Sequence, residues 1–158
     1  MTKRETPDWP DIEVTGDILT RTAARLPEKT ALICGNERLT YAGMDAASNQ
    51  VAHALLALRL AAGAKIAIMA RNVPAYALAY FGAARSGHVL VHASTRYIAS
   101  ELSYVLNKAD CDVLIVEAAF ASVAAAALEE STRVQHLITI DDVLNEHATP
   151  EGATTFAS

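Results

Sequence analysis

Short runs of consecutive apolar residues, separated by longer amphipathic segments, dominate the middle of the chain. The runs are Ile66–Ala70, Val89–Val91 and Val113–Val116. Segments of helix length lie between them, one from Pro74 to Ser86 and one from Glu101 to Lys108. Apolar runs of this length are typical of strands buried on both faces of a parallel sheet. The pattern therefore predicts an α/β fold built from consecutive βαβ units.

The segments on either side of this core extend the same fold. Gly35-Asn36 separates two strand-like runs and predicts a small antiparallel hairpin with a two-residue loop. Thr40 can cap a helix, apolar residues recur after it at three- and four-residue spacing, and Gly63 is expected to end it. The predicted fold class is a three-layer α/β/α domain with a mainly parallel sheet, plus the N-terminal hairpin. The other elements expected are a helix over 15–26, hairpin strands over 30–34 and 37–40, a helix over 118–130 and a strand over 134–140.

A single domain accounts for the sequence. A chain of 158 residues can bury one substantial core and is short for two. Residues 1–14 are polar and contain Pro7 and Pro10, so we interpret them as an N-terminal arm. The α/β domain then covers 15–147, with a short helical turn over 141–146. The small and polar residues of 148–158 are expected to form a loose tail.

Composition and charge exclude several classes of protein. The net charge is −5 and the charged residues are scattered, whereas a nucleic-acid-binding protein needs a basic stripe. No apolar run is long enough to span a bilayer, and no apolar signal segment follows the basic pair Lys3-Arg4, so we expect a cytoplasmic protein. Cys34 and Cys111 are far apart and lack metal-binding spacing, which predicts free, partly buried thiols.

The sequence contains no strong phosphate-loop or metal-binding motif. Gly82 and Gly87 have the spacing of a phosphate loop, but the lysine and serine or threonine that must follow are missing. His88 and His92 lie on one side of a strand about 13 Å apart, too far to share a metal ion. We interpret His92 as a partly exposed strand-end residue, although such an end often borders a ligand crevice. Asn72 is interpreted as a turn residue whose side chain bonds the following backbone.

Several short motifs follow one another in a fixed order between residues 15 and 117. They are Gly16–Leu26, Thr40-Tyr41, Asn72 after a hydrophobic strand, Phe81-Gly82-Ala83-Ala84-Arg85-Ser86-Gly87 at a helix end, Val89, Arg96, Glu101-Leu102 and Val113–Val116. In this order they resemble the N-terminal part of the adenylate-forming enzymes. That family comprises the AMP-forming acyl-CoA synthetases and their relatives, the peptide-synthetase adenylation domains and the luciferases.

Arg96 is the one candidate binding residue that the resemblance supplies. It matches an arginine that, in some acyl-CoA synthetases, contacts a phosphate of coenzyme A at the surface of the large domain. A guanidinium suits phosphate because it offers paired donors and stays charged. An ordinary surface arginine on a loop after a strand is the equal alternative, and Ser94 and Thr95 replace the family's Asn and Pro just before it. No catalytic or metal-binding residue is assigned.

The resemblance also implies cofactors for a larger parent enzyme. The family holds ATP with a Thr/Ser-Gly-rich loop ending in Pro-Lys-Gly, and a Tyr-Gly-x-Thr-Glu motif and a catalytic lysine follow later; none has a counterpart in this sequence. The predicted parent is an AMP-forming acid–CoA ligase that uses ATP, Mg²⁺ and coenzyme A. This chain is its N-terminal part, expected to bind none of the three tightly alone. Its partner would be the remainder of that ligase, and bared apolar surface predicts self-association.

Two other functions are open on the sequence. The first is a non-catalytic scaffold or dimerisation module derived from the family. The second is a stand-alone flavodoxin-like domain that binds a nucleotide or flavin at the carboxyl ends of its strands, near Asn72 and His92–Arg96. The acid substrate is not specified, because the family builds its acyl pocket mostly from residues beyond Ser158.

Overall fold

Helices and strands alternate along the chain. The computed structural model describes residues 14–131, 133–141 and 154–156. Nearly all of the expected arm, all but the first residue of the expected turn over 141–146, and most of the expected tail lie outside these residues. The elements in order are α1 (Thr15–Arg25), β1 (Thr30–Cys34), β2 (Glu37–Thr40), α2 (Tyr41–Ala57), β3 (Lys65–Met69), α3 (Pro74–Arg85), β4 (Val89–His92), α4 (Ala99–Lys108), β5 (Cys111–Glu117), the 3₁₀ turn η1 (Ala118–Phe120), α5 (Ala121–Glu129), β6 (His136–Ile140) and β7 (Thr154–Thr155).

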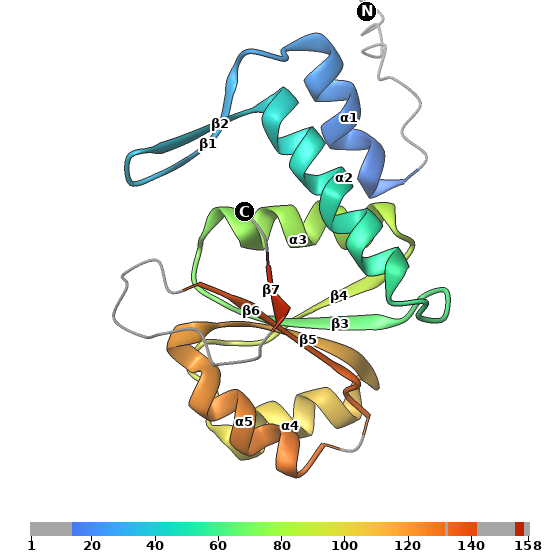
Figure 1. Cartoon of the computed structure of the whole chain (residues 1–158), viewed down its shortest axis with the longest axis vertical. Coiled ribbons are helices and arrows are strands. Elements are labelled where there is room, and N and C mark those ends of the chain that lie inside the picture. The colour runs from blue at the N-terminus through green and yellow to red at the C-terminus, as the bar shows by residue number, and fades with distance from the viewer. Residues whose placement is uncertain (1–13, 132, 142–153, 157–158) are drawn as a thin grey trace, which may run out of the picture.

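The main sheet has five strands in the order β4-β3-β5-β6-β7, and every neighbouring pair is parallel. The helices α1, α2 and α3 lie on one side of this sheet, and α4 and α5 cover the other side (Figure 1). β1 and β2 form a separate antiparallel hairpin, in which Cys34 faces Glu37 across the two-residue loop. The predicted fold class is therefore confirmed. No described helix is long and apolar enough to cross a membrane.

The central strands β3 and β5 are buried on both faces, as their continuous apolar runs predicted. Alternate residues supply two separate cores. Ile66, Ile68, Val113 and Ile115 pack on the side of α3, while Leu114 packs with α4 and α5 on the opposite side. The two cores cover both faces of the sheet, so a binding site must lie at the strand edges or helix ends.

Gly82 allows α2 and α3 to pack closely. A side-chain carbon placed on Gly82 would lie 2.5 Å from Cγ1 and 2.7 Å from Cβ of Val51 on α2. Such distances are far below van der Waals contact, so any side chain at this position would push the two helices apart. The close packing of α2 against α3 therefore explains why a glycine lies inside the predicted helix.

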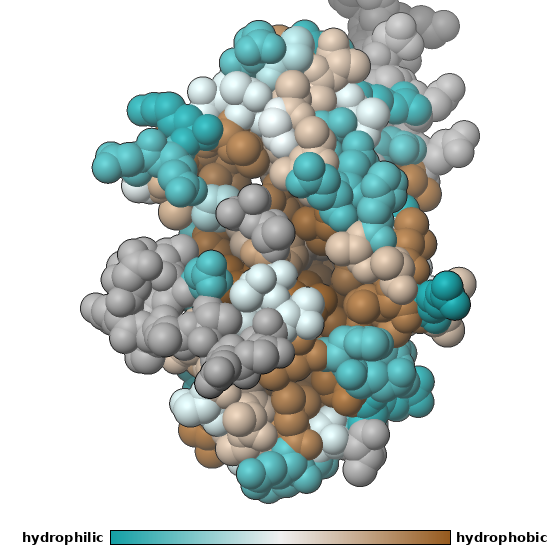
Figure 2. All heavy atoms as spheres, viewed as in Figure 1, coloured by the Kyte–Doolittle hydropathy of each residue, from teal (hydrophilic) through white to brown (hydrophobic). Residues whose placement is uncertain are grey.

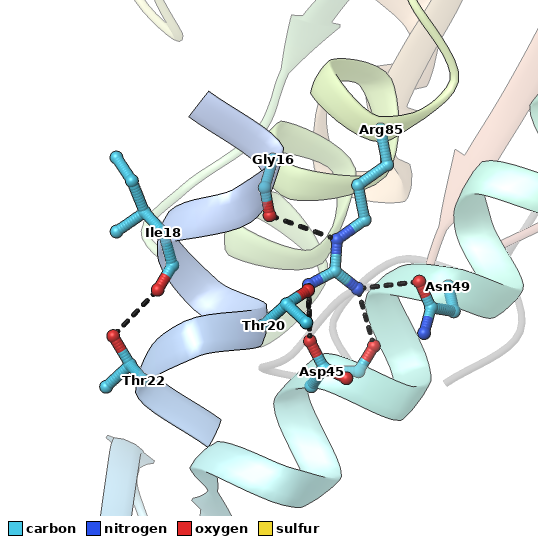
Figure 3. Close-up of polar contacts among 7 residues, drawn as sticks. All are labelled: Gly16, Ile18, Thr20, Thr22, Asp45, Asn49 and Arg85. Atoms are coloured by element: carbon cyan, nitrogen blue, oxygen red, sulfur yellow. Dashed lines mark hydrogen bonds and ion pairs between the residues drawn. The ribbon is translucent and has the colours of Figure 1, made fainter. Parts of the chain in front are cut away.

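Arg85, at the end of α3, joins three helices through a partly exposed network of hydrogen bonds (Figure 3). Its guanidinium donates to the backbone oxygens of Gly16 and Asp45, to the side-chain oxygens of Thr20 and Asn49, and forms an ion pair with the Asp45 carboxylate. Thr20 also donates to Asp45, at 3.0 Å. This cluster ties α1 and α2 to α3.

Several element boundaries differ from the expected ones. α2 ends at Ala57, and Arg59 adopts a left-handed conformation with φ of 55° before the turn that leads to β3. The helix expected over 118–130 begins as the 3₁₀ turn η1 and becomes α-helical only at Ala121. Thr154 and Thr155, within the expected tail, pair with β6 as the short strand β7.

Candidate functional site

The carboxyl ends of β3, β4, β5 and β6 lie along one edge of the main sheet, because these strands are parallel. Ligands of open α/β sheets bind outside this edge, where successive crossovers turn to opposite faces. Here that point lies between β3 and β5: β3 leads into α3 on one face of the sheet, and β5 leads into α5 on the other. The residues that follow β3 and end β5 are therefore the first to consider.

An ion pair between Arg71 and the fully buried Glu117 occupies this point. Glu117, the last residue of β5, has a relative exposure of 0%. Its carboxylate accepts a hydrogen bond of 2.8 Å from the backbone N–H of Arg71 and one of 2.9 Å from Nε of the same residue. The pair locks the turn after β3 to the end of β5. Sequence reasoning missed it, and the only signal was a charged residue at the end of an apolar run.

His92, the last residue of β4, belongs to an aromatic cluster with two tyrosines of α3. Its Nδ1 lies 2.6 Å from the hydroxyl of Tyr76. Its ring stacks on Tyr76 with centroids 5.7 Å apart and on Tyr80 with centroids 6.3 Å apart. Burial raises the pKa of the Tyr76 hydroxyl, so that group stays protonated and can donate to His92. His92 is exposed at the strand end, as the sequence predicted.

Arg96 and Asn72, the other residues singled out from the sequence, are both exposed. Arg96 lies on the loop between β4 and α4, where its backbone N–H bonds the Ser94 hydroxyl at 3.2 Å. Among the described residues its guanidinium makes no ion pair, so it is accessible to an anion from solvent. The side chain of Asn72 makes no hydrogen bond with a described residue; the prediction that it bonds the following backbone was wrong. It lines a groove instead.

That groove has a volume of about 430 Å³ and separates β1 from α3. The described residues that line it are mainly apolar and aromatic, and none of them is charged. The lining residues are Leu32, Ile33, Cys34, Asn72, Val73, Tyr76, Ala77, Tyr80 and Phe81. Tyr76 and Tyr80 also contact His92, so the groove adjoins the aromatic cluster at the edge of the sheet.

A second hollow, of about 220 Å³, lies between α2 and the strands β5, β6 and β7. It is lined mostly by apolar side chains, among them Ala54, Leu58, Ile115, Ile138 and Phe156. Figure 2 shows hydrophobic residues gathered across the middle of this side of the molecule, between α2 and α5. The described residues cover this part of the sheet less than the part beneath α3.

Two further titratable groups, His88 and Cys111, have structural roles. Burial lowers the pKa of His88 despite the nearby charge of Asp112, and its Nδ1 lies 2.7 Å from the Ser86 hydroxyl. Burial raises the pKa of the Cys111 thiol to about 11, which makes it unreactive at neutral pH. Both cysteines are free, as predicted, with Cys34 half-buried and Cys111 fully buried. The described residues contain no cluster of three or more potential metal ligands.

The segment Phe81–Gly87 has packing roles, although it carries much of the family resemblance. Gly82 admits α2, and Arg85 bonds α1 and α2. Both positions lie in the second half of α3, whereas the carboxyl edge of the sheet lies at the start of that helix. The motif therefore stabilises the domain and contributes no group to the edge.

Comparisons with known proteins agree with this organisation. Residues 19–156 match the family model described as AMP-binding enzyme. A medium/long-chain-fatty-acid–CoA/3-oxocholest-4-en-26-oate–CoA ligase from Mycobacterium marinum is 29% identical over 133 residues, covering 84% of this chain and 24% of the relative. A putative acyl-CoA synthetase, YngI, from Bacillus subtilis is 35% identical over 103 residues, covering 64% of this chain and 19% of the relative.

Solved structures show the same fold. The anthranilate CoA ligase AuaEII, in complex with anthranoyl-AMP, superposes with a TM-score of 0.83 at 24% identity, covering 93% of this chain and 27% of that one. The inhibitor-bound N-terminal domain of FACL13 from Mycobacterium tuberculosis superposes with a TM-score of 0.76 at 30% identity, covering 81% of this chain and 33% of that one. This chain spans about a quarter of the length of these ligases. It belongs to the AMP-binding enzyme family.

Proposed function

We propose that this chain is the N-terminal part of an AMP-forming acid–CoA ligase. The complete enzyme would use ATP and Mg²⁺ to activate a carboxylic acid as its acyl-adenylate and would then transfer the acyl group to coenzyme A. The observation that carries the proposal is the family match over residues 19–156, which includes every element from α2 to β7. The names of the relatives support an acyl-CoA ligase within that family.

The chain alone is proposed to be inactive and to lack tight binding of ATP, Mg²⁺ and coenzyme A. Phosphoryl chemistry needs donors that hold the phosphates, a metal ion that neutralises them and a positioned lysine. At the carboxyl edge Arg71 pairs with Glu117 and His92 with Tyr76, and the single exposed Arg96 would not hold a nucleotide tightly by itself. We propose a cytoplasmic location, where ATP and coenzyme A would be available to the complete ligase.

The test of this proposal is pyrophosphate release. When the 158-residue chain is mixed with ATP, Mg²⁺ and a panel of aliphatic and aromatic acids, we expect release at the rate of a heat-denatured control. A complete acyl-CoA ligase assayed in parallel shows that the conditions support the reaction. Acid-dependent pyrophosphate release by the chain itself would overturn the proposed inactivity.

Arg96 is proposed to contact a phosphate of coenzyme A in the complete ligase. Its exposed guanidinium lies on the loop after β4 and has no ion-pair partner among the described residues. We expect Arg96→Ala in the complete enzyme to raise the KM for coenzyme A about tenfold, equivalent to one charge-assisted contact, and to leave the KM for ATP unchanged. Arg25→Ala is the matched control, because Arg25, at the end of α1, is likewise exposed and has no ion pair among the described residues. Equal changes in the two KM values would contradict the assignment.

The two alternative functions have different support. A scaffold or dimerisation module agrees with the packing roles of Gly82 and Arg85, and it would differ from the ligase proposal in having no downstream ligase sequence. A flavodoxin-like nucleotide site has less support, because the Arg71–Glu117 pair fills the position between β3 and β5 where such a ligand would bind. Saturable binding of a nucleotide or flavin by this chain would favour the flavodoxin-like domain.

Self-association is proposed to occur through the hollow between α2 and the strands β5 to β7. Apolar patches of this kind are seldom left exposed in monomeric proteins. We expect the sedimentation coefficient to rise with concentration, and Ala54→Glu to abolish the rise by placing a charge in the hollow. Ala57→Glu, also exposed on α2 but outside the hollow, is the control. A monomer at high concentration would contradict this proposal.

A further inference from the structure

The turn that joins α3 to β4 is closed by hydrogen bonds of a serine and a histidine. The backbone N–H of Ser86 donates to the carbonyl of Gly82 at 3.0 Å, and that of His88 donates to the carbonyl of Ala83 at 2.9 Å. Gly87 between them has a φ of 73°, which glycine adopts without strain. Within the described residues β4 pairs only with β3, so this turn contributes much of what fixes the start of β4.

The contacts of the Ser86 hydroxyl determine where His88 carries its hydrogen. The hydroxyl oxygen lies 2.9 Å from the carbonyl oxygen of Gly82, 3.1 Å from that of Ala83 and 2.7 Å from Nδ1 of His88. Carbonyl oxygens only accept, so the single hydroxyl hydrogen must point toward them; otherwise the oxygens would face one another with no hydrogen between them. The hydroxyl therefore presents a lone pair to His88, and Nδ1 donates. Neutral His88 is thereby held with its hydrogen on Nδ1 and a lone pair on Nε2.

The surroundings of His88 disfavour a second proton on its ring. The residue is 8% exposed, and its Nε2 makes no hydrogen bond with a described residue. The neighbouring cation on α3, Arg85, is turned toward α1 and α2, where it pairs with Asp45. A proton at Nε2 would add a charge at a largely buried position without a hydrogen-bond partner, which is costly. Burial accordingly lowers the pKa of His88.

Asp112, at the start of β5, is the charged group that acts on His88 from a neighbouring strand, and its charge opposes the effect of burial on the pKa. Its carboxylate has other partners: Oδ2 accepts from the backbone N–H of Lys65 at 3.4 Å, and Oδ1 lies 3.6 Å from Nε of Arg133. The charges of Lys65 and Asp110 act on the buried thiol that begins β5. A protonated His88 would thus meet one carboxylate, which is already bonded elsewhere.

We propose that Ser86 and His88 form a proton-sensitive clasp, which holds the start of β4 to the end of α3 at neutral pH and loosens when His88 takes up a proton at Nε2. Because burial lowers the pKa of His88, the folded chain binds this proton less readily than the unfolded chain. The clasp is therefore fully stabilising above about pH 6.5, the ordinary pKa of histidine, and its contribution is lost as the pH falls toward the lower pKa of the folded chain. The clasp involves no substrate, so its test is independent of the ligase function proposed above.

NMR of the isotope-labelled 158-residue chain tests the clasp directly. Each imidazole is assigned through its own backbone, and His53, exposed on α2, is the reference. At neutral pH we expect hydrogen on Nδ1 of His88 and none on Nε2, and on acidification His88 should take up its proton at a lower pH than His53. Exchange protection of the Ser86 and His88 amides, relative to Leu114 in β5, should then fall about tenfold, as loss of about one hydrogen bond would cause.

Two sets of variants distinguish the clasp from a turn with a purely structural role. Ser86→Ala removes the acceptor, so neutral His88 should become a mixture of tautomers, and Ser86→Thr, which keeps the hydroxyl, should restore the Nδ1–H form. Asp112→Asn removes the opposing charge but can still accept from Lys65, so His88 should take up its proton at a still lower pH. Asp110→Asn is the matched control, because the charge of Asp110 acts on the β5 thiol, and it should leave the His88 titration unchanged.

Several results would overturn the clasp. One is a wild-type His88 that carries its hydrogen on Nε2 at neutral pH, or that takes up its proton at the same pH as His53 or above it. Another is unchanged amide protection of Ser86 and His88 through the titration, because the turn would then be insensitive to the proton. An unchanged tautomer in Ser86→Ala would show that the hydroxyl does not fix the hydrogen, which contradicts the proposal as well.

Discussion

Replacing Glu117 by alanine is expected to lower the free energy of unfolding by about 3 kcal/mol. The carboxylate is fully buried and accepts hydrogen bonds from both the backbone and the side chain of Arg71. Loss of one partner of a buried ion pair costs about 3–5 kcal/mol when the other charge stays buried. The Arg71 side chain is 32% exposed and can regain water, which favours the lower end of that range.

Urea unfolding followed by circular dichroism measures this effect. Glu129→Ala is the control, because Glu129 is exposed on α5 and its removal should change the free energy of unfolding by no more than about 0.5 kcal/mol. The expected result is a lower midpoint with an unchanged slope for the Glu117 variant alone. If both variants unfold at the same urea concentration, the ion pair contributes nothing to stability and the turn after β3 is held by other contacts.

Replacing Gly82 by valine is expected to cost about 2–3 kcal/mol. The new side chain would overlap Val51, whose Cγ1 and Cβ lie 2.5 Å and 2.7 Å from the position of the added carbon. The nearest atoms belong to a short β-branched side chain on a buried face of α2, which cannot swing away. The helices must therefore separate, and separation would also strain the hydrogen bonds of Arg85 to Asp45 and Asn49.

Gly43→Ala provides the matched control, because Gly43 also lies in a helix. A carbon added there would approach Cδ1 of Leu39 at 3.3 Å, at the flexible end of a half-buried side chain. That change should be neutral or stabilise the protein by up to about 1 kcal/mol, since alanine favours the helix over glycine. Thermal unfolding compares the two variants. An unchanged melting temperature for Gly82→Val would show that close approach of α2 is not required.

The architecture could be predicted from sequence because each helix and strand is determined by residues close together in the chain. The apolar runs of β3 and β5 are long enough to identify strands buried on both faces, and Gly35-Asn36 identifies the hairpin. Thr40 caps α2 by accepting a hydrogen bond from the Gly43 N–H at 3.1 Å, which its position also predicted. These features depend on residues a few positions apart.

The contacts of the candidate site could not be predicted in the same way. Arg71 and Glu117 are 46 residues apart and meet only because β3 and β5 are neighbours, and strand order does not follow from hydrophobic periodicity. The stacking of His92 on Tyr76 and Tyr80 likewise depends on the packing of α3 beside β4. The role of Arg96 stays a prediction, because it concerns a ligand and a larger enzyme.

The intact mass of the protein produced from its own gene tests the central claim most directly. The chain has a mass of 16.8 kDa and spans 24% of the Mycobacterium marinum ligase. If it is the N-terminal part of an acid–CoA ligase, the native product should have a mass several-fold above 16.8 kDa. A native product of 16.8 kDa would contradict this account and would favour a scaffold or dimerisation module derived from the family.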